Sequence, residues 1–363
     1  MRILVVNCGS ATLKYKLFAV ETGGMQPLTG GVVEISGGYR AAVAKALEML
    51  PQAPEAIAHR VVHGGDRLPD VVQVDIQLLN QLRELGPLAP LHNGPALEGI
   101  EATLGLGVPL IAAFDTAFHR TLPQRAWRYA LPDLPGIRRY GFHGWSHRFV
   151  TERYAELSGN PLPTIVTLHL GSGCSAAAIQ RGRSIDTSMG YTPLEGLVME
   201  TRPGDLDPGI LTHLMQQGMT LDRLRRVLHH ESGLQGLAGS HDMRELLGRD
   251  DEKAVAALEI FCYRILKYVG AYLTILGGAE AIVFTGGIGE NSPEIRRRIC
   301  EGLSWVGLEM DGFRNARGEE RISAEGSRMA AYTIRTDEER VIAREAFRLL
   351  ASGEALDCSP GPP

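Results

Sequence analysis

Two stretches of this chain share one strand–turn–strand design, and this repetition limits the possible folds more than any other feature. In the first stretch, the β-branched run Ile3–Val6 predicts a buried strand, and Asn7–Ser10 supplies small polar residues for a tight turn. From Leu13 to Leu17 apolar side chains alternate with lysines, which predicts a second strand with one buried face. The chain is therefore expected to begin with a β-hairpin.

The second stretch repeats this pattern near the middle of the chain. Thr164–Leu170 predicts a strand, Gly171–Gly173 a tight polar turn, and Cys174–Ile179 a returning strand. Asn7–Ser10 and His169–Ser172 occupy equivalent places in the two stretches. The correspondence indicates an internal duplication with one copy in each of two domains, and 363 residues suffice for two domains with separate cores.

The tip of the first hairpin has the chemistry of an anion site. Asn7 contributes an amide, Ser10 and Thr12 contribute hydroxyls, and Lys14 contributes a cation beside open backbone N–H groups. Such a set suits a phosphate or a phosphate-bound metal. An ordinary hairpin turn would have the same composition, so this stretch alone leaves both interpretations open.

A third glycine-rich element lies toward the end of the chain. Ala281–Thr285 predicts a strand, Gly286–Asn291 a glycine loop, and Ser292–Pro293 the start of a helix. The chain contains no GxxxxGK[ST] sequence, so any nucleotide site is of another type than the P-loop. Gly171–Ala176 matches the dinucleotide fingerprint, but a hairpin is predicted after it where that fingerprint needs a helix.

Two other polar positions allow more than one interpretation. Pro109–Asp115 predicts a buried strand with Asp115 at its carboxyl end, where ligands bind in α/β sheets. An aspartate there can equally cap the next turn. His59 and His63 have the spacing of a zinc-binding helix, but Arg60 stands where a metalloprotease needs glutamate and the flanks are strand-like, which argues against zinc.

Local signals also predict how several other segments fold. We expect a loop over Leu88–Pro95 and a long irregular segment, without a core role, over Asp186–Leu197. The helix Glu338–Leu350 is expected to begin with a capping box of Thr336 and Glu339. Other helix starts are predicted at the capping residues Asp207, Thr220 and Ser292.

Composition narrows the class of protein. The net charge of −5 gives no global basic field for nucleic acid. The five cysteines form no CxxC pair, which argues against a disulfide framework or a zinc site and favours a reducing cytoplasm. The most apolar long segment, Ala254–Leu276, is interrupted by Glu259, Arg264 and Lys267, so it predicts a buried core helix and not a membrane span.

Three glycine-bearing strand–loop elements and two related hairpins together resemble the actin, hexokinase and heat-shock ATPase superfamily. Within it the chain is most similar to the acetokinase family, which comprises acetate kinase and its propionate and butyrate relatives. The motifs that resemble this family extend from residue 3 to about residue 345: Arg60–Gly65, Phe114–His119, Arg139–Gly144, Asp186–Leu197, Arg202 with Gly204–Asp205, Glu231–Leu234 and Thr285–Ser292.

The resemblance implies an α/β fold of two duplicated ribonuclease H-like (actin-like ATPase) domains with a central cleft. Residues 1–118 and 340–363 would form the first domain, and residues 119–339 the second, nucleotide-binding domain. The implied reaction is reversible transfer of the ATP γ-phosphoryl group to a short-chain carboxylate. Acetate is the expected acceptor, propionate or butyrate the alternative, and a nucleotide-binding regulator without turnover is the alternative of another class.

The resemblance also implies a role for individual residues. Arg60 resembles the arginine that grips the substrate carboxylate, Arg202 the one that spans acceptor and phosphoryl group, and His143 the histidine that donates to the phosphoryl oxygens. Asp115 resembles the catalytic acid/base. A carboxylate acceptor is already ionised at neutral pH and needs no base, so we favour an orienting role for Asp115, or a hold on the metal through water.

Binding groups follow from the same motifs. Asn7 and Glu338 resemble the ligands of Mg²⁺, with Mn²⁺ as the alternative metal, and few protein ligands suffice because Mg²⁺ keeps waters and phosphate oxygens. Val62, Leu91, Phe142 and Pro193 match the pocket for the acyl methyl group. The residues implied to contact ATP are Ser10, Thr12, Lys14, His169, Leu170, Gly171, Ser172, Gly173, Asp242, Met243, Arg244, Gly287, Ile288, Gly289, Glu290 and Asn291.

Three positions depart from the family pattern, and one of them, Thr12 in place of the usual serine, keeps the hydroxyl. Ser172 stands where the family usually has asparagine, which shortens the reach of that side chain toward a phosphate. Glu200 stands where the family usually has glycine and adds a negative charge near an anionic site. The family is typically homodimeric, so a homodimer is expected here, with acetate and ATP as small-molecule partners and neither nucleic acid nor membrane.

Overall fold

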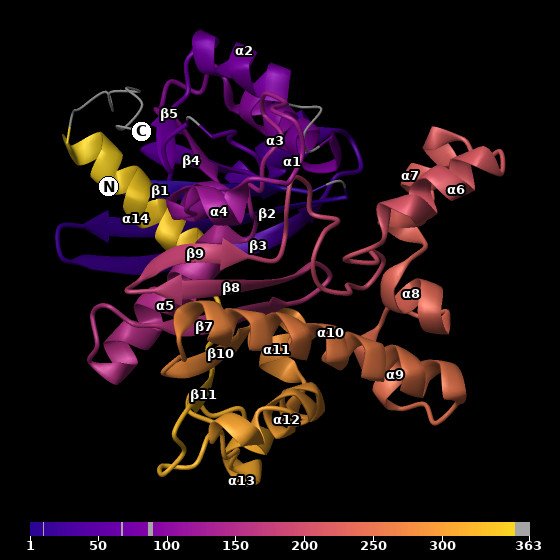
Figure 1. Ribbon diagram of the computed structural model, residues 1–363. Coiled ribbons are helices and arrows are strands. Elements are labelled where there is room, and N and C mark those ends of the chain that lie inside the picture. The colour runs from indigo at the N-terminus through magenta and orange to yellow at the C-terminus, as the bar shows by residue number, and fades with distance from the viewer. Residues whose placement is uncertain (10, 67, 86–89, 353–363) are drawn as a thin grey trace. The chain divides into compact units, whose positions relative to one another are not determined.

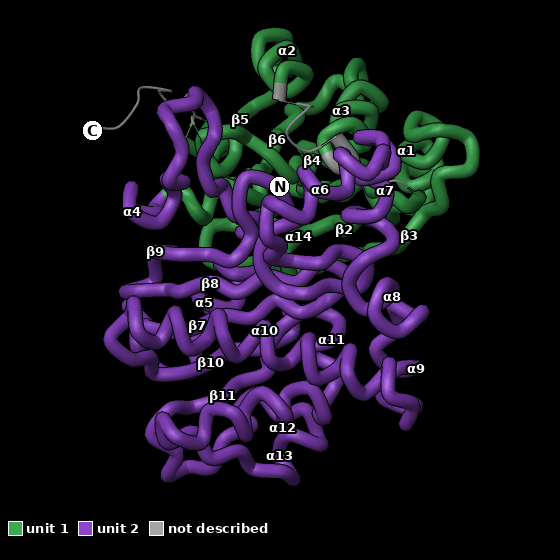
Figure 2. Tube along the Cα trace, turned by 45° about the vertical axis from the view of Figure 1, so that its right-hand side comes forward, with its two compact units in different colours: residues 1–120, 337–363 green, residues 121–336 purple. Residues whose placement is uncertain are grey.

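The computed structural model describes residues 1–9, 11–66, 68–85 and 90–352. The chain forms two compact units (Figure 2). Unit 1 comprises residues 1–120 and 337–363, and unit 2 comprises residues 121–336. The sequence-based division fell at 118/119 and 339/340, so residues 119–120 and 337–339 belong to unit 1 instead. Arg120 is held there by ion pairing to Asp70, and Asp337 by ion pairing to Lys16.

Unit 1 is built on a six-stranded sheet with the order β3-β2-β1-β4-β6-β5 (Figure 1). Strands β1, β4 and β6 are mutually parallel, and β2, β3 and β5 are antiparallel to their neighbours. The strands are β1 (Arg2–Cys8), β2 (Thr12–Glu21), β3 (Gly24–Glu34), β4 (Ala56–Val61), β5 (Val71–Gln73) and β6 (Leu110–Phe114); the helices are α1 (Tyr39–Glu48), α2 (Ile76–Leu85), α3 (Pro90–Thr103) and α14 (Glu338–Ser352).

The core of unit 1 follows from strand alternation. Leu4 and Val6 point to the face where α1 contributes Ala42 and Val43. The intervening residues of β1 are also fully buried and face the other way, where α14 contacts β1, β2, β4, β5 and β6. The sheet is therefore covered on both sides, which explains the continuous apolar run in β1.

Unit 2 is built on a five-stranded sheet with the order β11-β10-β7-β8-β9. The strands are β7 (Ile165–Leu170), β8 (Cys174–Gln180), β9 (Arg183–Thr187), β10 (Ala281–Thr285) and β11 (Ala330–Thr333). Helix α5 (Gly144–Ser158) and helix α10 (Glu252–Leu276) both contact the sheet. The other helices are α4 (Gln124–Trp127), α6 (Pro208–Gln216), α7 (Leu221–His230), α8 (Gly233–Ala238), α9 (Met243–Leu247), α11 (Gly286–Asn291), α12 (Pro293–Glu301) and α13 (Gly312–Arg317).

The two sheets have the same plan, which confirms the predicted duplication. In each, an antiparallel meander of three strands (β1–β3 or β7–β9) is extended by parallel strands beside its first member. Strands β4 and β6 in unit 1 correspond to β10 and β11 in unit 2. The first hairpin of each unit therefore occupies the same place in its sheet.

Several local predictions are confirmed. Asp207 and Thr220 accept hydrogen bonds from the backbone at the starts of α6 and α7, and Ser292 does so at the start of α12. Helix α10 is long and largely buried, as its sequence predicted. Among the described residues, no helix combines the length and the apolar character needed to cross a membrane.

Other local predictions are wrong. Helix α3 already begins at Pro90, inside the predicted loop, since proline suits the first turn of a helix. The glycine loop after β10 is the short helix α11. The Thr336 hydroxyl is buried without a hydrogen-bond partner among the described residues, and Asp337 accepts from the Arg340 N–H in its place. The segment Asp186–Leu197 has a core role, because Met189 and Leu197 are fully buried.

Candidate functional site

The carboxyl ends of the parallel strands of unit 1 gather its predicted polar residues. Asn7 lies near the end of β1 and Arg60 near the end of β4, and the register places Val6 beside His59. Asp115 directly follows β6, and its backbone N–H donates to the Val61 carbonyl at 3.0 Å. This edge is where ligands bind in α/β sheets.

Arg60 forms a bidentate ion pair with Asp115. Arg60 Nε donates to Asp115 Oδ1 at 2.8 Å, and its second guanidinium nitrogen donates to Oδ2 at 2.6 Å. The Asp115 side chain is only 1% exposed, and that of Arg60 is 16% exposed. Burial by itself would lower the pKa of Arg60, but the carboxylates of Asp115 and Glu338 raise it above the ordinary arginine value. The guanidinium is thus fixed in position and permanently charged.

Glu338 reaches the same arginine from the first turn of α14. Its Oε2 lies 3.3 Å from Arg60 Nη1. Burial raises the pKa of Glu338, although Arg60 and Lys14 oppose that shift. The neighbouring cations therefore do not fully offset the burial of the Glu338 carboxylate, and a bound cation would stabilise its ionised form.

We tested these residues as a metal site by their donor chemistry. Glu338 and Asn7 supply oxygen atoms, the ligand type that Mg²⁺ prefers. Among the described residues no group of three or more His, Cys, Asp or Glu side chains could hold a metal ion. The donor set therefore fits a metal that brings most of its ligands as water and phosphate oxygens.

The hairpin tip of unit 1 also carries a backbone turn and a cation. The Gly9 N–H donates to the Thr12 carbonyl at 2.8 Å, and the Tyr39 hydroxyl donates to the Gly9 carbonyl at 2.9 Å. Lys14 stands opposite Asn7 in the β1–β2 register and its side chain is exposed. Ser10 lies outside the described residues. Lys14 is consequently available to an anion at this edge.

The residues predicted to surround the acyl methyl group come from both units. Val62 follows β4 in unit 1 and is half-buried. Leu91 lies in the first turn of α3, and its side chain is outside the described part of the chain. In unit 2, Phe142 is 1% exposed and Pro193 is buried.

In unit 2, one face of the sheet gathers histidines and hydroxyls beneath α5. The register pairs His169 with Ser175, so these two side chains and Thr167 share a face. Ser146, in the first turn of α5, hydrogen-bonds His169 Nδ1 at 2.8 Å. The His143 ring stacks on His169 with centroids 4.2 Å apart.

His143 has an unusual backbone conformation immediately before α5. Its φ of 56° and ψ of 28° lie in the left-handed region, which non-glycine residues seldom adopt. Such strained positions persist where the surrounding structure holds them and are common at functional sites. His143 is therefore held at the start of α5 with its side chain partly exposed.

Gly173, in the turn between β7 and β8, marks where His143 and Arg202 meet. A Cβ at Gly173 would lie 2.6 Å from an Arg202 guanidinium nitrogen and 3.1 Å from His143 Nε2. Any side chain at this position would therefore displace both groups. Gly171 in the same turn lies near the backbone N–H of Gly287, and a Cβ there would be 3.6 Å from that nitrogen.

Arg202 has a very different environment from Arg60. Its Nη1 donates to the Pro193 carbonyl at 2.7 Å, and it forms no ion pair with the described residues. Burial lowers the pKa of Arg202, and Cys174 and Glu200 oppose that shift. Glu200 thus influences the site through its charge, without direct pairing to Arg202. The result is a half-buried cation whose charge is not neutralised by a neighbouring carboxylate.

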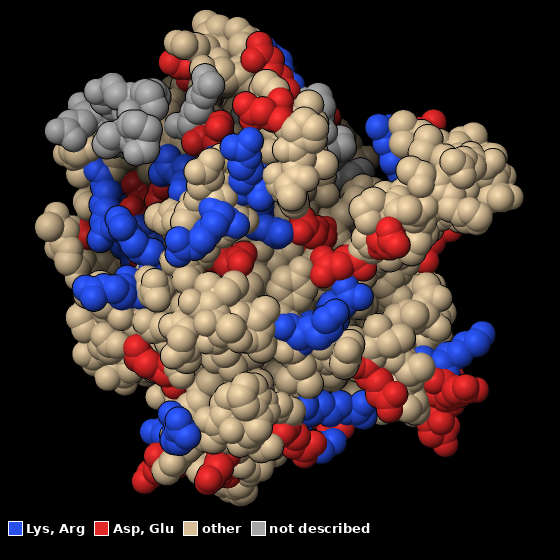
Figure 3. Space-filling view, in the orientation of Figure 1, with Lys and Arg blue, Asp and Glu red and all other residues tan. Residues whose placement is uncertain are grey.

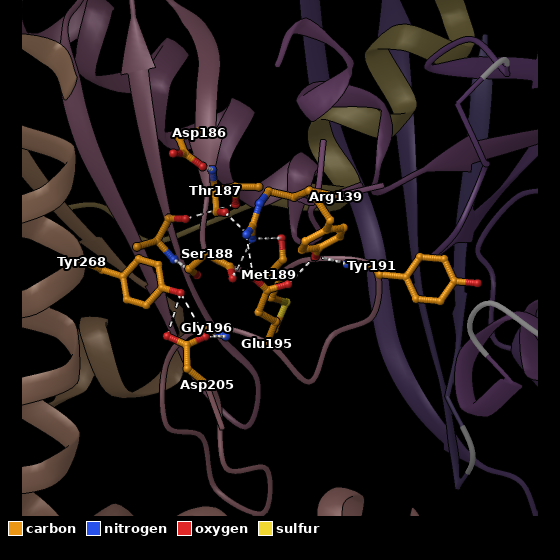
Figure 4. Close-up of polar contacts among 12 residues, drawn as sticks. Arg139, Asp186, Thr187, Ser188, Met189, Tyr191, Glu195, Gly196, Asp205 and Tyr268 are labelled. Carbon is orange, nitrogen blue, oxygen red and sulfur yellow. Dashed lines mark hydrogen bonds and ion pairs between the residues drawn. The ribbon is translucent and has the colours of Figure 1, made fainter. Parts of the chain in front are cut away.

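Sequence reasoning missed the polar cluster that shapes the segment before Arg202 (Figure 4). Arg139 donates to the carbonyls of Thr187, Ser188 and Met189 at 3.0, 3.2 and 3.2 Å, and to Glu195 at 2.5 Å. The Tyr129 hydroxyl also bonds Glu195. This cluster ties both ends of the turn that carries Pro193. The only sequence signal was the high density of polar and aromatic residues around Arg139.

A second cluster fastens the other end of this segment. Asp205 accepts from the Gly196 N–H at 2.8 Å and from the Tyr268 hydroxyl at 3.1 and 3.0 Å (Figure 4). Arg264 pairs with the same carboxylate at 3.2 Å. Tyr268 and Arg264 belong to α10, so the Arg202 turn is anchored to the longest helix of the unit.

The predicted nucleotide residues of α11 have mixed surroundings. Gly287 and Asn291 are exposed, whereas Ile288 and Gly289 are buried. Glu290 accepts from Thr285, from the Gly286 N–H and from the Thr336 N–H. Its side chain therefore stabilises the start of α11, which leaves the backbone around Gly287 as the open part.

The other predicted nucleotide positions are likewise divided. Asp242 caps α9 by accepting from the Arg244 N–H at 2.8 Å and pairs with the Arg244 guanidinium, which lowers the pKa of Asp242. Met243 is buried. Leu170 is buried in β7, and the Ser172 side chain is exposed at the turn.

Comparison with known proteins agrees with this architecture. The family model described as the acetokinase family matches residues 40–344. The chain is 44% identical to an acetate kinase from Chloroherpeton thalassium, over 98% of this chain and all of that protein. It is 45% identical to an acetate kinase from Pseudarthrobacter chlorophenolicus, over 97% of this chain and all of that protein.

Solved structures give the same result. A Porphyromonas gingivalis acetate kinase has a TM-score of 0.86 at 36% identity, with 96% of this chain and 99% of that chain covered. A Francisella tularensis propionate kinase has a TM-score of 0.88 at 35% identity, with 95% and 98% covered. The chain therefore belongs to the acetokinase family.

Proposed function

We propose that this protein transfers the γ-phosphoryl group of ATP to acetate, giving acetyl phosphate and ADP in a reversible, metal-dependent reaction. Family membership over nearly the whole chain supports the reaction class. The observation that supports the chemistry most directly is the Arg202 guanidinium, half-buried beside His143 and without a carboxylate partner among the described residues.

The reaction itself needs charge and position more than a base. An acetate oxygen, already anionic at neutral pH, attacks the γ-phosphorus in line, and the bond from that phosphorus to the β–γ bridging oxygen breaks. The main obstacle is repulsion between two anions. Because two unit charges about 4 Å apart interact by roughly 4 kcal/mol at an effective dielectric of 20, one well-placed guanidinium changes the barrier substantially.

Arg60 is proposed to bind the acetate carboxylate. Its fork with Asp115 fixes the direction of the guanidinium, and this geometry supports an orienting role for Asp115. Asp115 itself is 1% exposed and already accepts two hydrogen bonds from Arg60. A proton-transfer role is therefore unnecessary for an acceptor that is already ionised.

Arg202 and His143 are proposed to stabilise the transferring phosphoryl group. Both lie where a side chain of residue 173 would project, so any residue other than glycine there would displace them. Groups that are held in place before the reaction give the largest electrostatic stabilisation of a transition state. The proposal requires that these residues of unit 2 and Arg60 of unit 1 act on the same pair of reactants during turnover.

Nucleotide and metal are assigned to the glycine turns and the Glu338 edge. Asn7 and Glu338 would hold Mg²⁺, or Mn²⁺ in its place, together with phosphate oxygens and water. When bound, the metal neutralises charge on the β- and γ-phosphates. Thr12, Lys14, the turn His169–Gly173 and the open backbone around Gly287 are proposed to contact ATP; Ser10, Asp242, Met243, Arg244 and the remaining residues of 288–291 complete the proposed set.

A propionate kinase activity is the second candidate, since a solved propionate kinase shares the fold at 35% identity. We favour acetate because the family resemblance implies a small pocket for the acyl methyl group, formed by Val62, Leu91, Phe142 and Pro193. One additional methylene is worth about 1–3 kcal/mol in such a pocket. Propionate is therefore expected to be a slower substrate and not an excluded one.

The test is to trap the acyl phosphate. Purified protein is incubated with Mg-ATP, hydroxylamine and acetate, propionate or butyrate, and the acyl hydroxamate is measured against a reaction without carboxylate. We expect kcat/KM for acetate to exceed that for propionate about 10–200-fold. Failure to form hydroxamate from any carboxylate, with Mg²⁺ or Mn²⁺, would reject the activity. Equal kcat/KM values would reject the preference.

A homodimer and a cytoplasmic location are also proposed. Helix α6 has no buried residue and exposes Ile210 and Met215, and the arm that carries α6 and α7 is mostly uncharged in Figure 3. Such a surface is suited to a second copy of the chain. The described cysteines are free thiols, as in a reducing compartment. Sedimentation at several protein concentrations tests the dimer, and a monomer throughout would reject it.

A further inference from the structure

A line of hydrogen bonds leads away from His143 into the core of unit 2. His143 Nδ1 lies 3.0 Å from Ser175 Oγ, and the same oxygen lies 2.7 Å from His147 Nε2. His147 Nδ1 in turn lies 2.8 Å from Thr167 Oγ1. Ser175, His147 and Thr167 are all completely buried. The line therefore runs from His143, which is partly exposed, to Thr167, which is completely buried.

The buried Thr167 hydroxyl determines the direction of the hydrogen bonds along this line. Within the described part of the chain, the Thr167 hydroxyl has His147 Nδ1 as its hydrogen-bond partner. Because this hydroxyl is buried, its proton is satisfied only if it is donated to that nitrogen. His147 Nδ1 must then be an acceptor, so the proton of a neutral His147 ring is on Nε2.

The same direction determines which nitrogen of His143 carries the proton. His147 Nε2–H donates to Ser175 Oγ, and the single Ser175 proton is then donated to His143 Nδ1. With Nδ1 occupied as an acceptor, the proton of neutral His143 is on Nε2. His143 Nε2 is the ring nitrogen that lies beside Arg202 at Gly173.

The reverse direction is less favourable. It would place the proton of His143 on Nδ1 and leave the buried Thr167 hydroxyl proton without an acceptor among the described residues. In a doubly protonated His143 the Nδ1–H would donate to Ser175, and the buried Ser175 proton would lose its acceptor. The stacked His169 ring and the Arg202 guanidinium also disfavour a positive charge at His143.

We infer that Thr167, His147 and Ser175 are positioning residues that hold His143 as the neutral Nε2–H tautomer, a hydrogen-bond donor facing the transferring phosphoryl group. The functional part of this inference rests on the proposed function. The tautomer matters because an unprotonated Nε2 would direct a lone pair at an anionic phosphoryl oxygen. This line of hydrogen bonds, called the relay below, thus makes His143 Nε2 a donor without adding a positive charge to the ring.

The direct test is a nitrogen NMR measurement on the full-length protein labelled with ¹⁵N-histidine. Resonances of His143 and His147 are assigned by their loss in His143→Gln and His147→Gln. Near neutral pH both rings should carry their proton on Nε2, with Nδ1 unprotonated. An Nδ1–H tautomer or an imidazolium at either ring would overturn the relay. This result does not depend on catalysis, so it is distinct from failure of the proposed function.

A kinetic cycle tests whether the relay acts through His143. Ser175→Ala should lower kcat about 10-fold, the effect of losing about one hydrogen bond to His143, with KM for acetate and ATP within about twofold. In a His143→Ala background the same change should have no further effect on kcat. Ser175→Thr, which keeps the hydroxyl, should retain more activity than Ser175→Ala.

Two kinetic outcomes would contradict the relay. Equal losses from Ser175→Ala with and without His143 would indicate general damage to the fold and no action through the ring. An unchanged kcat in Ser175→Ala would remove its positioning role. If Ser175→Ala fails to fold, Thr167→Val provides the same cycle, with Thr167→Ser as its matched control.

Discussion

Arg60 and Arg202 are the two arginines assigned to the reactants, and their surroundings are opposite. Arg60 is gripped by Asp115 and approached by Glu338, so its positive charge is compensated within unit 1. Arg202 is bound by the Pro193 carbonyl and forms no ion pair with the described residues. The carboxylates raise the pKa of Arg60 despite its burial, whereas burial lowers the pKa of Arg202.

The difference indicates separate roles for Arg60 and Arg202. A guanidinium that is held by two carboxylates is rigid, and its remaining N–H groups suit precise binding of a small carboxylate. A guanidinium without a carboxylate keeps its charge for an incoming anion, at a cost in desolvation. We therefore propose that unit 1 supplies a fixed binding group and that unit 2 supplies the charge for the transferring phosphoryl group.

The largest expected contrast is in stability. Arg60→Met leaves Asp115 buried and unpaired, and breaking a buried pair in this way costs about 3–5 kcal/mol. Arg202→Met removes a buried cation without stranding a carboxylate, so the free energy of unfolding should change by less than about 1 kcal/mol. Urea unfolding of both variants measures the difference.

A double variant provides the control for this contrast. Asp115→Leu combined with Arg60→Met removes both charges and should recover most of the loss, since an apolar pair can replace a buried ion pair. Equal destabilisation by Arg60→Met and Arg202→Met would show that the two environments do not differ as described.

A buried histidine of unit 1 makes the stability of the protein depend on pH. In unit 1, His59 Nε2 contacts Thr103 Oγ1 at 2.9 Å, and burial lowers the pKa of His59 to about 3. The unfolded chain, with a pKa near 6.5, then binds a proton that the folded chain does not. Stability is therefore lost as pH falls below 6.5, by about 1.4 kcal/mol per pH unit until the folded pKa is reached.

His59→Gln keeps a donor for Thr103 and removes the titration. Its loss of unfolding free energy between pH 7.5 and pH 5 should be about 2 kcal/mol smaller than that of the wild type. Urea titrations at the two pH values measure both losses. Parallel losses in the two proteins would mean that His59 does not contribute to acid sensitivity.

The smallest expected effect separates exposed from buried pairs within unit 1. Lys16 pairs with Asp337 at 2.9 Å, but both side chains are roughly one quarter to one third exposed. Lys16→Ala should therefore cost only about 0.2–1 kcal/mol, and the cost should shrink in high salt. A loss as large as that of Arg60→Met would contradict the role that burial has in the comparison.

Much of the fold could be predicted from the sequence, because it follows local rules. The hairpins follow from alternation and small polar turns, and Asp207, Thr220 and Ser292 cap helices where capping rules place them. The duplication of the sheet also followed, since Asn7–Ser10 and His169–Ser172 have similar neighbours. These features depend on residues that are close together in the chain.

Features that depend on distant partners were not predictable. The Arg139–Glu195 and Asp205–Tyr268 contacts join residues 56 and 63 positions apart, and no local pattern marks them. Thr336 and Asp337 were equally good capping residues by type, and the tertiary contact from Thr336 N–H to Glu290 decided against Thr336. Gly286, Gly287 and Gly289 suggested a loop, but Glu290 and Arg296 stabilise a helical turn there.

The central claim is that the uncompensated charge of Arg202 serves the transferring phosphoryl group. Its most direct test is kcat for acetyl phosphate formation by Arg202→Ala, with Arg202→Lys as the variant that keeps a cation. The account predicts that Arg202→Ala lowers kcat by at least about 10²-fold while the fold remains stable, and that Arg202→Lys is less impaired. A kcat for Arg202→Ala near that of the wild type would contradict it.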